Sequence, residues 1–225
     1  MTGLKALGHQ VECPDLPGHG SEPTDPRNVS LQACVSAVCD IVEGIDSPVI
    51  LVGHSMSGMV ISQVAQEMAA KLQRLVYLCA YLPCDGQSVF DLIAANRSEA
   101  TGDPIEKAMQ MSTDKRTCSI EASAIAPLFY NRCPATLRDE IPAAFPRQAT
   151  LPLAGKVSLT EDRFGRVPKS YICCLDDQVI PIRSQRLMLK KQPCDEMIQL
   201  DADHSPFLSC PDTLAQVLHS MGLPD

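Results

Sequence analysis

The fold is decided by the stretch Val49-Ile50-Leu51-Val52-Gly53-His54-Ser55-Met56-Ser57-Gly58. Its first four residues are apolar and three of them are β-branched, which predicts a strand buried on both faces. Gly53 interrupts this strand, and the apolar residues beyond it recur at helical spacing, which predicts a sharp turn from strand to helix. The apolar face of the predicted helix consists of Val60, Ile61, Val64, Ala65, Met68, Ala69 and Leu72.

The tip of this turn carries Ser55. A nucleophile on a strained turn requires very small residues two positions before and two positions after it, because the strand end and the helix start nearly touch there. Gly53 meets the first requirement and Ser57 approximates the second, so the stretch nearly matches the G-x-S-x-G nucleophile elbow. The alternative is a glycine-broken strand and helix of another α/β fold in which the serine is incidental.

The composition limits the class of protein. The 225 residues suit one globular domain with a sizeable core and room for an inserted lobe. A formal net charge of -8 without a basic cluster argues against a nucleic-acid partner. No segment approaches the roughly 18 consecutive apolar residues that cross a bilayer, and the first residues lack the apolar core of a signal peptide. We therefore expect no membrane span and a soluble, cytoplasmic protein.

The 11 cysteines raise the question of disulfides or a metal site. They stand inside apolar runs, as in Leu78-Cys79-Ala80 and Ile172-Cys173-Cys174-Leu175, with no C-x-x-C pair and no histidines at zinc-ligand spacing. We interpret them as small buried apolar residues in a reducing compartment, and we predict no metal site.

The first part of the chain alternates strands and helices. A short strand is predicted over His9–Asp15 and leads into the loop Leu16–Gly20, where His19 is expected to structure the loop rather than to act in catalysis. Ser30 is predicted to cap a helix ahead of the strand that ends at the elbow, and another buried strand is predicted over Leu75–Tyr81. Such alternation is typical of a parallel sheet flanked by helices.

The pattern changes from Cys84 to about Val167, where prolines are frequent and periodicity is weak. We predict an α/β core over residues 1–83 and 168–225, with a cap or lid insertion over 84–167. Short helical pieces are expected around 89–95, 105–111 and 120–130. The apolar residues of the cap that line a substrate pocket or form the cap's own core are Met109, Met111, Ile125, Leu128 and Phe129.

Two further strands are predicted to end at polar residues. The strand Ser170–Leu175 is followed by Asp176 and Asp177, and the short strand Met197–Leu200 leads to His204. Side chains just past the carboxyl ends of parallel strands gather at one edge of the sheet, where open sheets place their sites. The chain order Ser, Asp, His is that of a catalytic triad on an α/β sheet. Helices are expected through Leu187 and Leu189 and from about Ser209 to Asp212 onward.

The chemistry requires all three residue types. A serine hydroxyl is a poor nucleophile until a base takes its proton, so His204 must reach Ser55. The imidazolium formed in that step needs a carboxylate at its other nitrogen. Asp203 would have to fold back onto the ring of its own neighbour, so we interpret it as a loop residue. Asp176 and Asp177 both remain candidates for the acid.

Four segments carry a family resemblance: Asp15–Gly20, Gly53–Gly58, Tyr171–Pro181 and Asp203-His204. Together they resemble the methylesterase and hydroxynitrile-lyase family of α/β-hydrolases, especially its bacterial carboxylesterase-like members. This resemblance implies an α/β-hydrolase fold, a mostly parallel sheet flanked by helices with an inserted small helical cap. It also implies a cofactor-free ester hydrolase that forms an acyl-enzyme, with Asp177 as the acid and the backbone N–H of Met56 as one oxyanion donor.

Two departures from the family pattern refine these expectations. Members that cleave cyanohydrins carry a lysine directly after the histidine, whereas this chain has Ser205. The family also begins with an apolar strand ending in His-Gly, whose loop supplies the second oxyanion donor, and this chain starts after that place. We therefore expect weak esterase activity, an exposed strand edge and a tendency to associate.

The predicted function is a serine carboxylesterase with Ser55, Asp177 and His204 as its triad, acting on small to medium apolar esters. The expected partner is a small-molecule ester, without cofactor, nucleic acid or membrane span, and homodimerisation is compatible with the sequence. A non-catalytic ligand-binding protein on the same scaffold is the alternative, and a hydroxynitrile-lyase-like enzyme ranks third.

Overall fold

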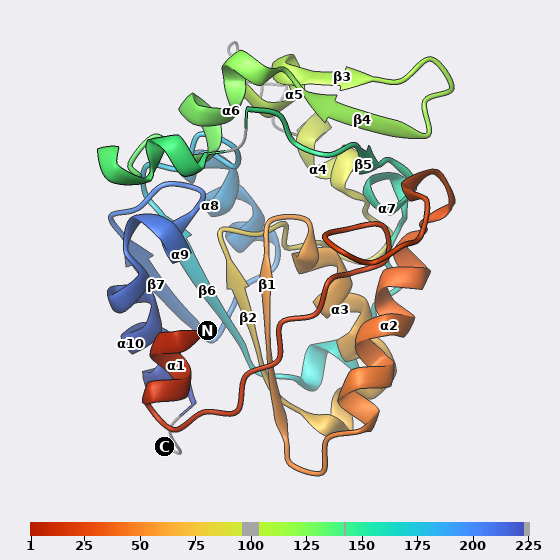
Figure 1. Ribbon diagram of the computed structural model, residues 1–225. Coiled ribbons are helices and arrows are strands. Elements are labelled where there is room, and N and C mark those ends of the chain that lie inside the picture. Colours follow the sequence, from red (N-terminus) through yellow and green to blue (C-terminus); the bar gives the residue numbers. More distant parts are fainter. Residues whose placement is uncertain (96–103, 142, 223–225) are drawn as a thin grey trace.

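A four-stranded parallel sheet forms the centre of the molecule (Figure 1). The computed structural model describes residues 1–95, 104–141 and 143–222. The strands lie in the order β1 (Val49–His54), β2 (Leu72–Leu78), β6 (Lys169–Cys174) and β7 (Glu196–Leu200). All neighbouring pairs are parallel, so the four carboxyl ends share one edge of the sheet.

The alternation of side chains along the strands separates two apolar cores. On one face, Tyr77 and Tyr171 pack with residues of α2 (Leu31–Glu43) and α3 (Ser57–Met68). On the other face, Val76 and Ile172 pack against α10 (Pro211–Met221). The inner strands β2 and β6 are therefore apolar at consecutive positions over Leu75–Leu78 and Tyr171–Cys174, because helices cover both faces. The strand predicted to be buried on both faces, β1, is instead an edge strand, and its Val52 is 43% exposed.

The helix predicted after Ser30 is present as α2. The Ser30 hydroxyl accepts a hydrogen bond from the backbone N–H of Ala33 at 3.1 Å, and the helix ends at Glu43, directly before Gly44. The other predicted helices of the core are also present as α8 (Ile182–Lys191) and α10, the latter preceded by the short helix α9 (Pro206–Ser209).

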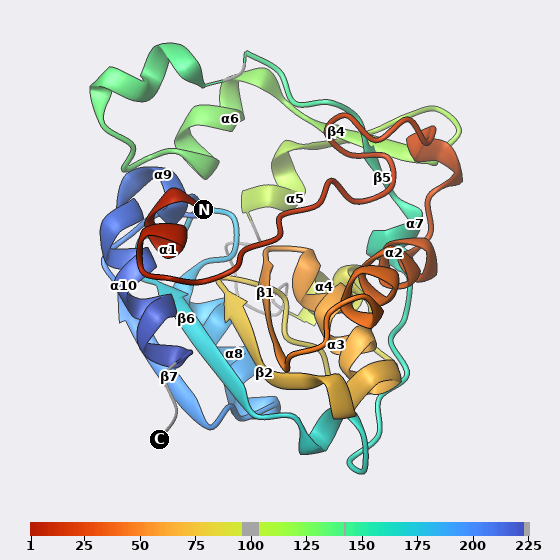
Figure 2. The same cartoon turned by 60° about the horizontal axis from the view of Figure 1, so that its bottom comes forward.

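The prediction of a strand over His9–Asp15 is wrong. This segment is irregular and largely exposed, and none of the described strands forms backbone hydrogen bonds with it as a sheet neighbour. It follows α1 (Thr2–Ala6), a helix that the sequence did not predict, and runs past β1 toward α2 (Figures 1 and 2). α1 packs on α10, where Gly3 lies against Ala215.

The residues after β2 form a lobe that lies beyond the carboxyl edge of the sheet (Figure 1). Its elements are α4 (Val89–Ala95), α5 (Pro104–Ala108), β3 (Met109–Met111), β4 (Thr117–Ile120), α6 (Ala122–Phe129), the 3-10 helix η4 (Ala135–Glu140), β5 (Gln148–Ala149) and α7 (Leu151–Ala154). The 3-10 helix η5 (Phe164–Arg166) lies away from this lobe, against α3 and just ahead of the amino end of β6 (Figure 1). Part of the predicted 84–167 insertion, residues 96–103 and 142, lies outside the described residues.

The helix expected over 105–111 ends earlier than predicted. It stops at Ala108, and Met109–Met111 pair with Cys118–Ile120 as an antiparallel hairpin that β5 extends to three strands. The tight turn between them places Lys115 at φ +56. The Ser112 backbone N–H donates to the Thr117 carbonyl oxygen at 2.8 Å, and the Thr117 N–H donates to Ser112 Oγ at 3.1 Å. The lobe is therefore a mixed helical and β structure. Among the described residues, no helix is both long and apolar enough to cross a bilayer.

Candidate active site

The turn that follows β1 holds Ser55 in a strained conformation. Its φ of +55 lies in the left-handed region, which residues with a side chain rarely occupy. The Ser55 carbonyl accepts hydrogen bonds from the backbone N–H of Gly58 at 3.2 Å and of Tyr81 at 3.0 Å. These two bonds tie the turn to α3 and to the loop after β2, so the strain is sustained by the surrounding backbone.

Two glycines allow the turn to close. A Cβ on Gly53 would lie 2.8 Å from the Ser57 carbonyl oxygen, and a Cβ on Gly58 would collide with the Tyr81 carbonyl oxygen. The tight approach on the helix side therefore falls on Gly58 rather than on residue 57. This explains why Ser57, which is only half-buried, is compatible with a nucleophile elbow.

The structure brings Asp177 and His204 together. Oδ2 of Asp177 lies 2.8 Å from His204 Nδ1, and both side chains are buried. The other carboxylate oxygen, Oδ1, accepts from the backbone N–H groups of Val179 at 2.7 Å and Ile180 at 2.8 Å. Since a carboxylate can only accept here, His204 Nδ1 carries its proton, and Nε2 is left as the basic nitrogen.

Asp176 lies elsewhere. Its carboxylate is exposed and faces Arg132 at 3.5 Å. Of the two aspartates that the sequence left open, the structure thus places Asp177 against the imidazole.

The basic nitrogen of His204 has no partner within the described part of the chain: Nε2 is buried and makes no hydrogen bond. Its ring lies beside that of His54, the residue preceding Ser55, with ring centroids 4.5 Å apart. Bonds between a base and its nucleophile are often long before substrate binds. The Met56 amide likewise makes no hydrogen bond with any described residue, so it is available as a donor.

Asp203 is a loop residue, as predicted. It is fully buried and accepts from the backbone N–H groups of Ser205 at 3.0 Å and Arg132 at 2.9 Å, and from the Ser209 hydroxyl at 2.8 Å. The Arg132 guanidinium also binds Asp201 through two contacts of 2.8 Å. Asp203 therefore fixes the turn after His204 and joins it to the lobe.

His19 also structures its loop. Its two ring nitrogens lie 3.0 Å from the Pro17 carbonyl oxygen and 3.0 Å from Oε1 of Gln148 on β5. Gln148 Nε2 in turn lies 3.8 Å from the Met56 sulfur. The loop is thus tied to the lobe close to the elbow.

His54 and Cys79 are site residues that sequence reasoning missed. The His54 Nε2 donates to the His204 carbonyl oxygen at 2.7 Å, and the Cys79 thiol donates to the same oxygen at 3.7 Å. Burial is the main cause that lowers the pKa of His54 to about 3, and electrostatic repulsion by the neighbouring His204 is the second. The only sequence signal was position, since His54 directly precedes the serine and Cys79 directly follows β2.

Aromatic side chains of the lobe cover the His204 ring. Phe129 meets it edge-on with ring centroids 5.5 Å apart, and Phe145 packs against Phe129 at 4.9 Å. Of the apolar residues predicted to line a pocket or the lobe's core, Ile125 is buried, whereas Met111 is 46% exposed and lines a hollow on the β3–β4 hairpin. Met109, Leu128 and Phe129 are partly buried against the main core.

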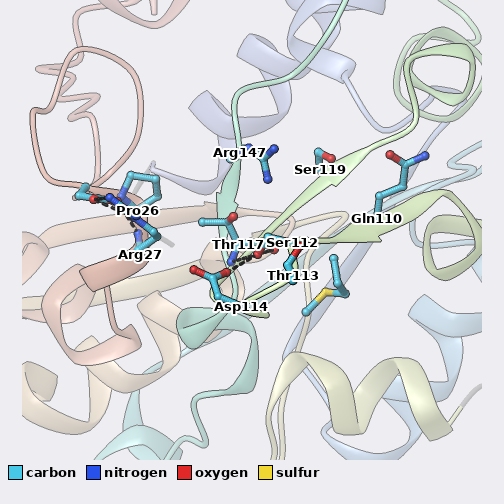
Figure 3. Close-up of a pocket in the computed structure, with 11 residues that line it drawn as sticks. Pro26, Arg27, Gln110, Ser112, Thr113, Asp114, Thr117, Ser119 and Arg147 are labelled. Carbon is cyan, nitrogen blue, oxygen red and sulfur yellow. Dashed lines mark hydrogen bonds and ion pairs between the residues drawn. The ribbon is translucent and has the colours of Figure 1, made fainter.

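Two hollows on the described surface do not contain Ser55, Asp177 or His204. One of about 540 Å³ lies beside α6 and is lined mainly by apolar residues such as Ala126 and Tyr130. The other, of about 650 Å³, lies on the β3–β4 hairpin opposite Pro26 and Arg27, with Arg147 and Ser119 on its wall (Figure 3). Polar and charged groups line it, so it is not an apolar ester pocket.

The match to a family model over residues 1–217 shows that the chain belongs to the alpha/beta hydrolase family. Among its relatives, the pyrethroid hydrolase of Sphingobium wenxiniae is 30% identical over 222 residues, covering 96% of this chain and 78% of that protein. The putative chloroplastic methylesterase 11 of Arabidopsis thaliana is 29% identical over 228 residues, covering 96% of this chain. A crystal structure of a pyrethroid hydrolase from Sphingobium faniae JZ-2 has a TM-score of 0.85 at 29% identity, covering 97% of this chain and 88% of that chain.

These comparisons confirm the predicted fold and the predicted resemblance to esterases of this family. The chain spans only part of some relatives, namely 57% of methylesterase 11 and 51% of methylesterase 13.

Proposed function

We propose that the protein is a serine carboxylesterase that hydrolyses small to medium apolar carboxylic esters through an acyl-enzyme on Ser55. The observation that carries this proposal is the buried contact of 2.8 Å between Asp177 and His204 Nδ1, which leaves His204 Nε2 free of hydrogen bonds to any described residue. The names of the relatives, pyrethroid hydrolase and methylesterase, support an ester as the substrate. The aromatic cover over His204 supports an apolar one.

In the proposed acylation step, Ser55 Oγ attacks the ester carbonyl carbon while His204 Nε2 takes the hydroxyl proton. The imidazolium that forms is stabilised by the Asp177 carboxylate, whose geometry is fixed by two backbone N–H groups. The negative charge that develops on the carbonyl oxygen is stabilised by the Met56 N–H. Collapse of this intermediate expels the alcohol, which receives the proton from His204.

Deacylation repeats the step with water. His204 takes a proton from the water, which attacks the acyl carbon, and the released Ser55 oxygen regains a proton from the imidazolium. Since the burial of Asp177 and His204 excludes bulk solvent from their contact, the carboxylate interacts strongly with the imidazolium. The proposed chemistry therefore uses only side chains and backbone groups of this chain.

The test is pre-steady-state hydrolysis of p-nitrophenyl esters with acetyl, butyryl and octanoyl chains. We expect a burst of nitrophenolate stoichiometric with the protein, and an acyl adduct on Ser55 detectable by mass spectrometry. Ser55→Ala should abolish both, and Ser57→Ala, two residues away, is the matched control. Saturable binding of these esters without a burst would support the non-catalytic alternative instead.

A further inference from the structure

We propose that His54 is a positioning residue whose ring N–H holds the His204 backbone in place, so that the imidazole keeps its contact with Asp177. This inference rests on the proposed esterase function. It goes beyond that function because His54 contributes neither the nucleophile, the base nor the acid.

The first argument is the hydrogen bond itself. The His54 Nε2 lies 2.7 Å from the His204 carbonyl oxygen, and a carbonyl can only accept, so Nε2 carries the proton. The bond joins the last residue of β1 to the loop after β7, which occupy opposite edges of the sheet. No backbone ladder connects these two strands, so His54 supplies a direct tie between the nucleophile turn and the base.

The second argument is the packing of the ring. His54 is held between His204, at 4.5 Å between ring centroids, and Phe207 of α9, at 5.2 Å. Both contacts come from the segment that carries the base. The orientation of the donor is therefore fixed from two sides, as a group that must position another residue requires.

The third argument is charge. A protonated His54 would repel the imidazolium that His204 becomes during turnover. Burial keeps the pKa of His54 far below neutrality, at about 3, so the ring is a neutral donor wherever the enzyme operates. A lysine or arginine could donate to the same oxygen but would bring a permanent charge.

The Cys79 thiol is a second donor to the His204 carbonyl oxygen. It donates to the His204 carbonyl at 3.7 Å from a residue held at φ +35. His54, Cys79 and His204 place their ligand atoms within 4.8 Å of one another, which is also compatible with a metal site. The hydrogen bonds favour the positioning role. A metal bound to His54 Nε2 and Cys79 Sγ would displace the two protons that these atoms donate to the His204 carbonyl oxygen.

The experiment compares His54→Gln with His54→Phe. Glutamine presents an amide N–H at about the reach of Nε2, whereas phenylalanine keeps the ring contacts and removes the donor. We expect His54→Phe to lower kcat for p-nitrophenyl butyrate by about 10- to 100-fold with KM changed less than about twofold, since displacement of a catalytic group by about 1 Å costs about 100-fold. His54→Gln should retain kcat within about threefold. His219→Phe, which removes another hydrogen-bonded histidine far from the site, should match the wild type.

A second readout is independent of turnover. In ¹⁵N-histidine-labelled protein, the His204 Nδ1 proton bound to Asp177 should give a slowly exchanging downfield resonance in the wild type and in His54→Gln. The resonance should broaden or disappear in His54→Phe while the thermal unfolding transition stays cooperative.

The outcomes separate the two proposals. Equal kcat in all His54 variants, or a resonance that His54→Phe leaves unchanged, would overturn the positioning role. A wild type without esterase activity whose resonance nevertheless depends on His54 would overturn the proposed function and leave the positioning role standing. If His54→Phe fails to fold, His54→Gln decides alone. Because this variant keeps an N–H donor, a loss of both kcat and the resonance in folded His54→Gln would overturn the proposal that the N–H group positions His204.

Discussion

Replacement of Asp177 by asparagine isolates the acid of the proposed triad, because the change is nearly isosteric. The wild-type carboxylate accepts three hydrogen bonds, two from backbone N–H groups at 2.7 and 2.8 Å and one from His204 at 2.8 Å. Asparagine has one acceptor oxygen and one amide nitrogen. If the oxygen keeps the two backbone donors, the amide N–H group faces His204 Nδ1.

This arrangement forces the wrong tautomer on the base. Nδ1 must then accept, so the proton moves to Nε2, where it blocks proton transfer from Ser55. The same carboxylate-to-amide change in a serine protease triad lowers kcat by about 10⁴-fold, which corresponds to roughly 5.5 kcal/mol of activation free energy. We expect a loss of that order for Asp177→Asn in p-nitrophenyl butyrate hydrolysis, with little change in the melting temperature.

The neighbouring aspartate is the matched control. The Asp176 side chain is 45% exposed, and its carboxylate contacts Arg132 at 3.5 Å and Gln178 Nε2 at 3.4 Å. Exposed ion pairs contribute about 0.2 to 1 kcal/mol. Asp176→Asn should therefore keep kcat within about fivefold. Similar losses in the two variants, or more than about a tenth of the wild-type kcat in Asp177→Asn, would refute the assignment of the acid.

Three further predictions concern the site and the core. Ser55→Ala and His204→Ala should each lower kcat by at least about 10³-fold without unfolding the protein, as followed by steady-state kinetics and circular dichroism; retention of a tenth of the activity would contradict their roles. Gly58→Ala should lower the free energy of unfolding by about 1 to 3 kcal/mol in urea denaturation, because the added methyl group collides with the Tyr81 carbonyl oxygen. The control Gly44→Ala adds a methyl group that meets only ordinary contacts beyond 3.4 Å, so it should change this free energy by less than about 1 kcal/mol. Burial raises the pKa of Cys34 and Cys173 to about 11, so at pH 8 both thiols stay protonated and iodoacetamide should label the exposed Cys13 first; rapid labelling of Cys173 in the folded protein would show that the core is open.

The sequence predicted the core elements well because their signals are local. The strand before Gly53 and the cap at Ser30 each depend on neighbours within a few residues, and both are present. Burial of that strand on both faces was predicted wrongly, because its place at the edge of the sheet leaves Val52 43% exposed. The position of the serine turn could be predicted for the same reason. A glycine spacing that lets a strand and a helix approach is visible in the sequence without knowledge of the rest of the fold.

The errors concern properties that depend on distant partners. His9–Asp15 has the alternation of a strand, but a strand forms only where another strand accepts its hydrogen bonds, and none of the described strands does so. Met109–Met111 follow a helix in the sequence, yet Cys118–Ile120 pair with them across a turn. The role of His54 was also invisible, because its partner is 150 residues away.

The attachment of the lobe to the turn after His204 has a consequence for the dynamics of the molecule. The Arg132 amide and guanidinium bind Asp203 and Asp201, so the lobe cannot swing away from this turn without leaving the buried Asp203 carboxylate short of a donor. Outward motion of the lobe and loosening of the segment around His204 therefore belong to one cooperative opening unit. In native-state hydrogen exchange, the amide protons of Arg132 and Ser205 should share a single opening free energy and the same denaturant dependence.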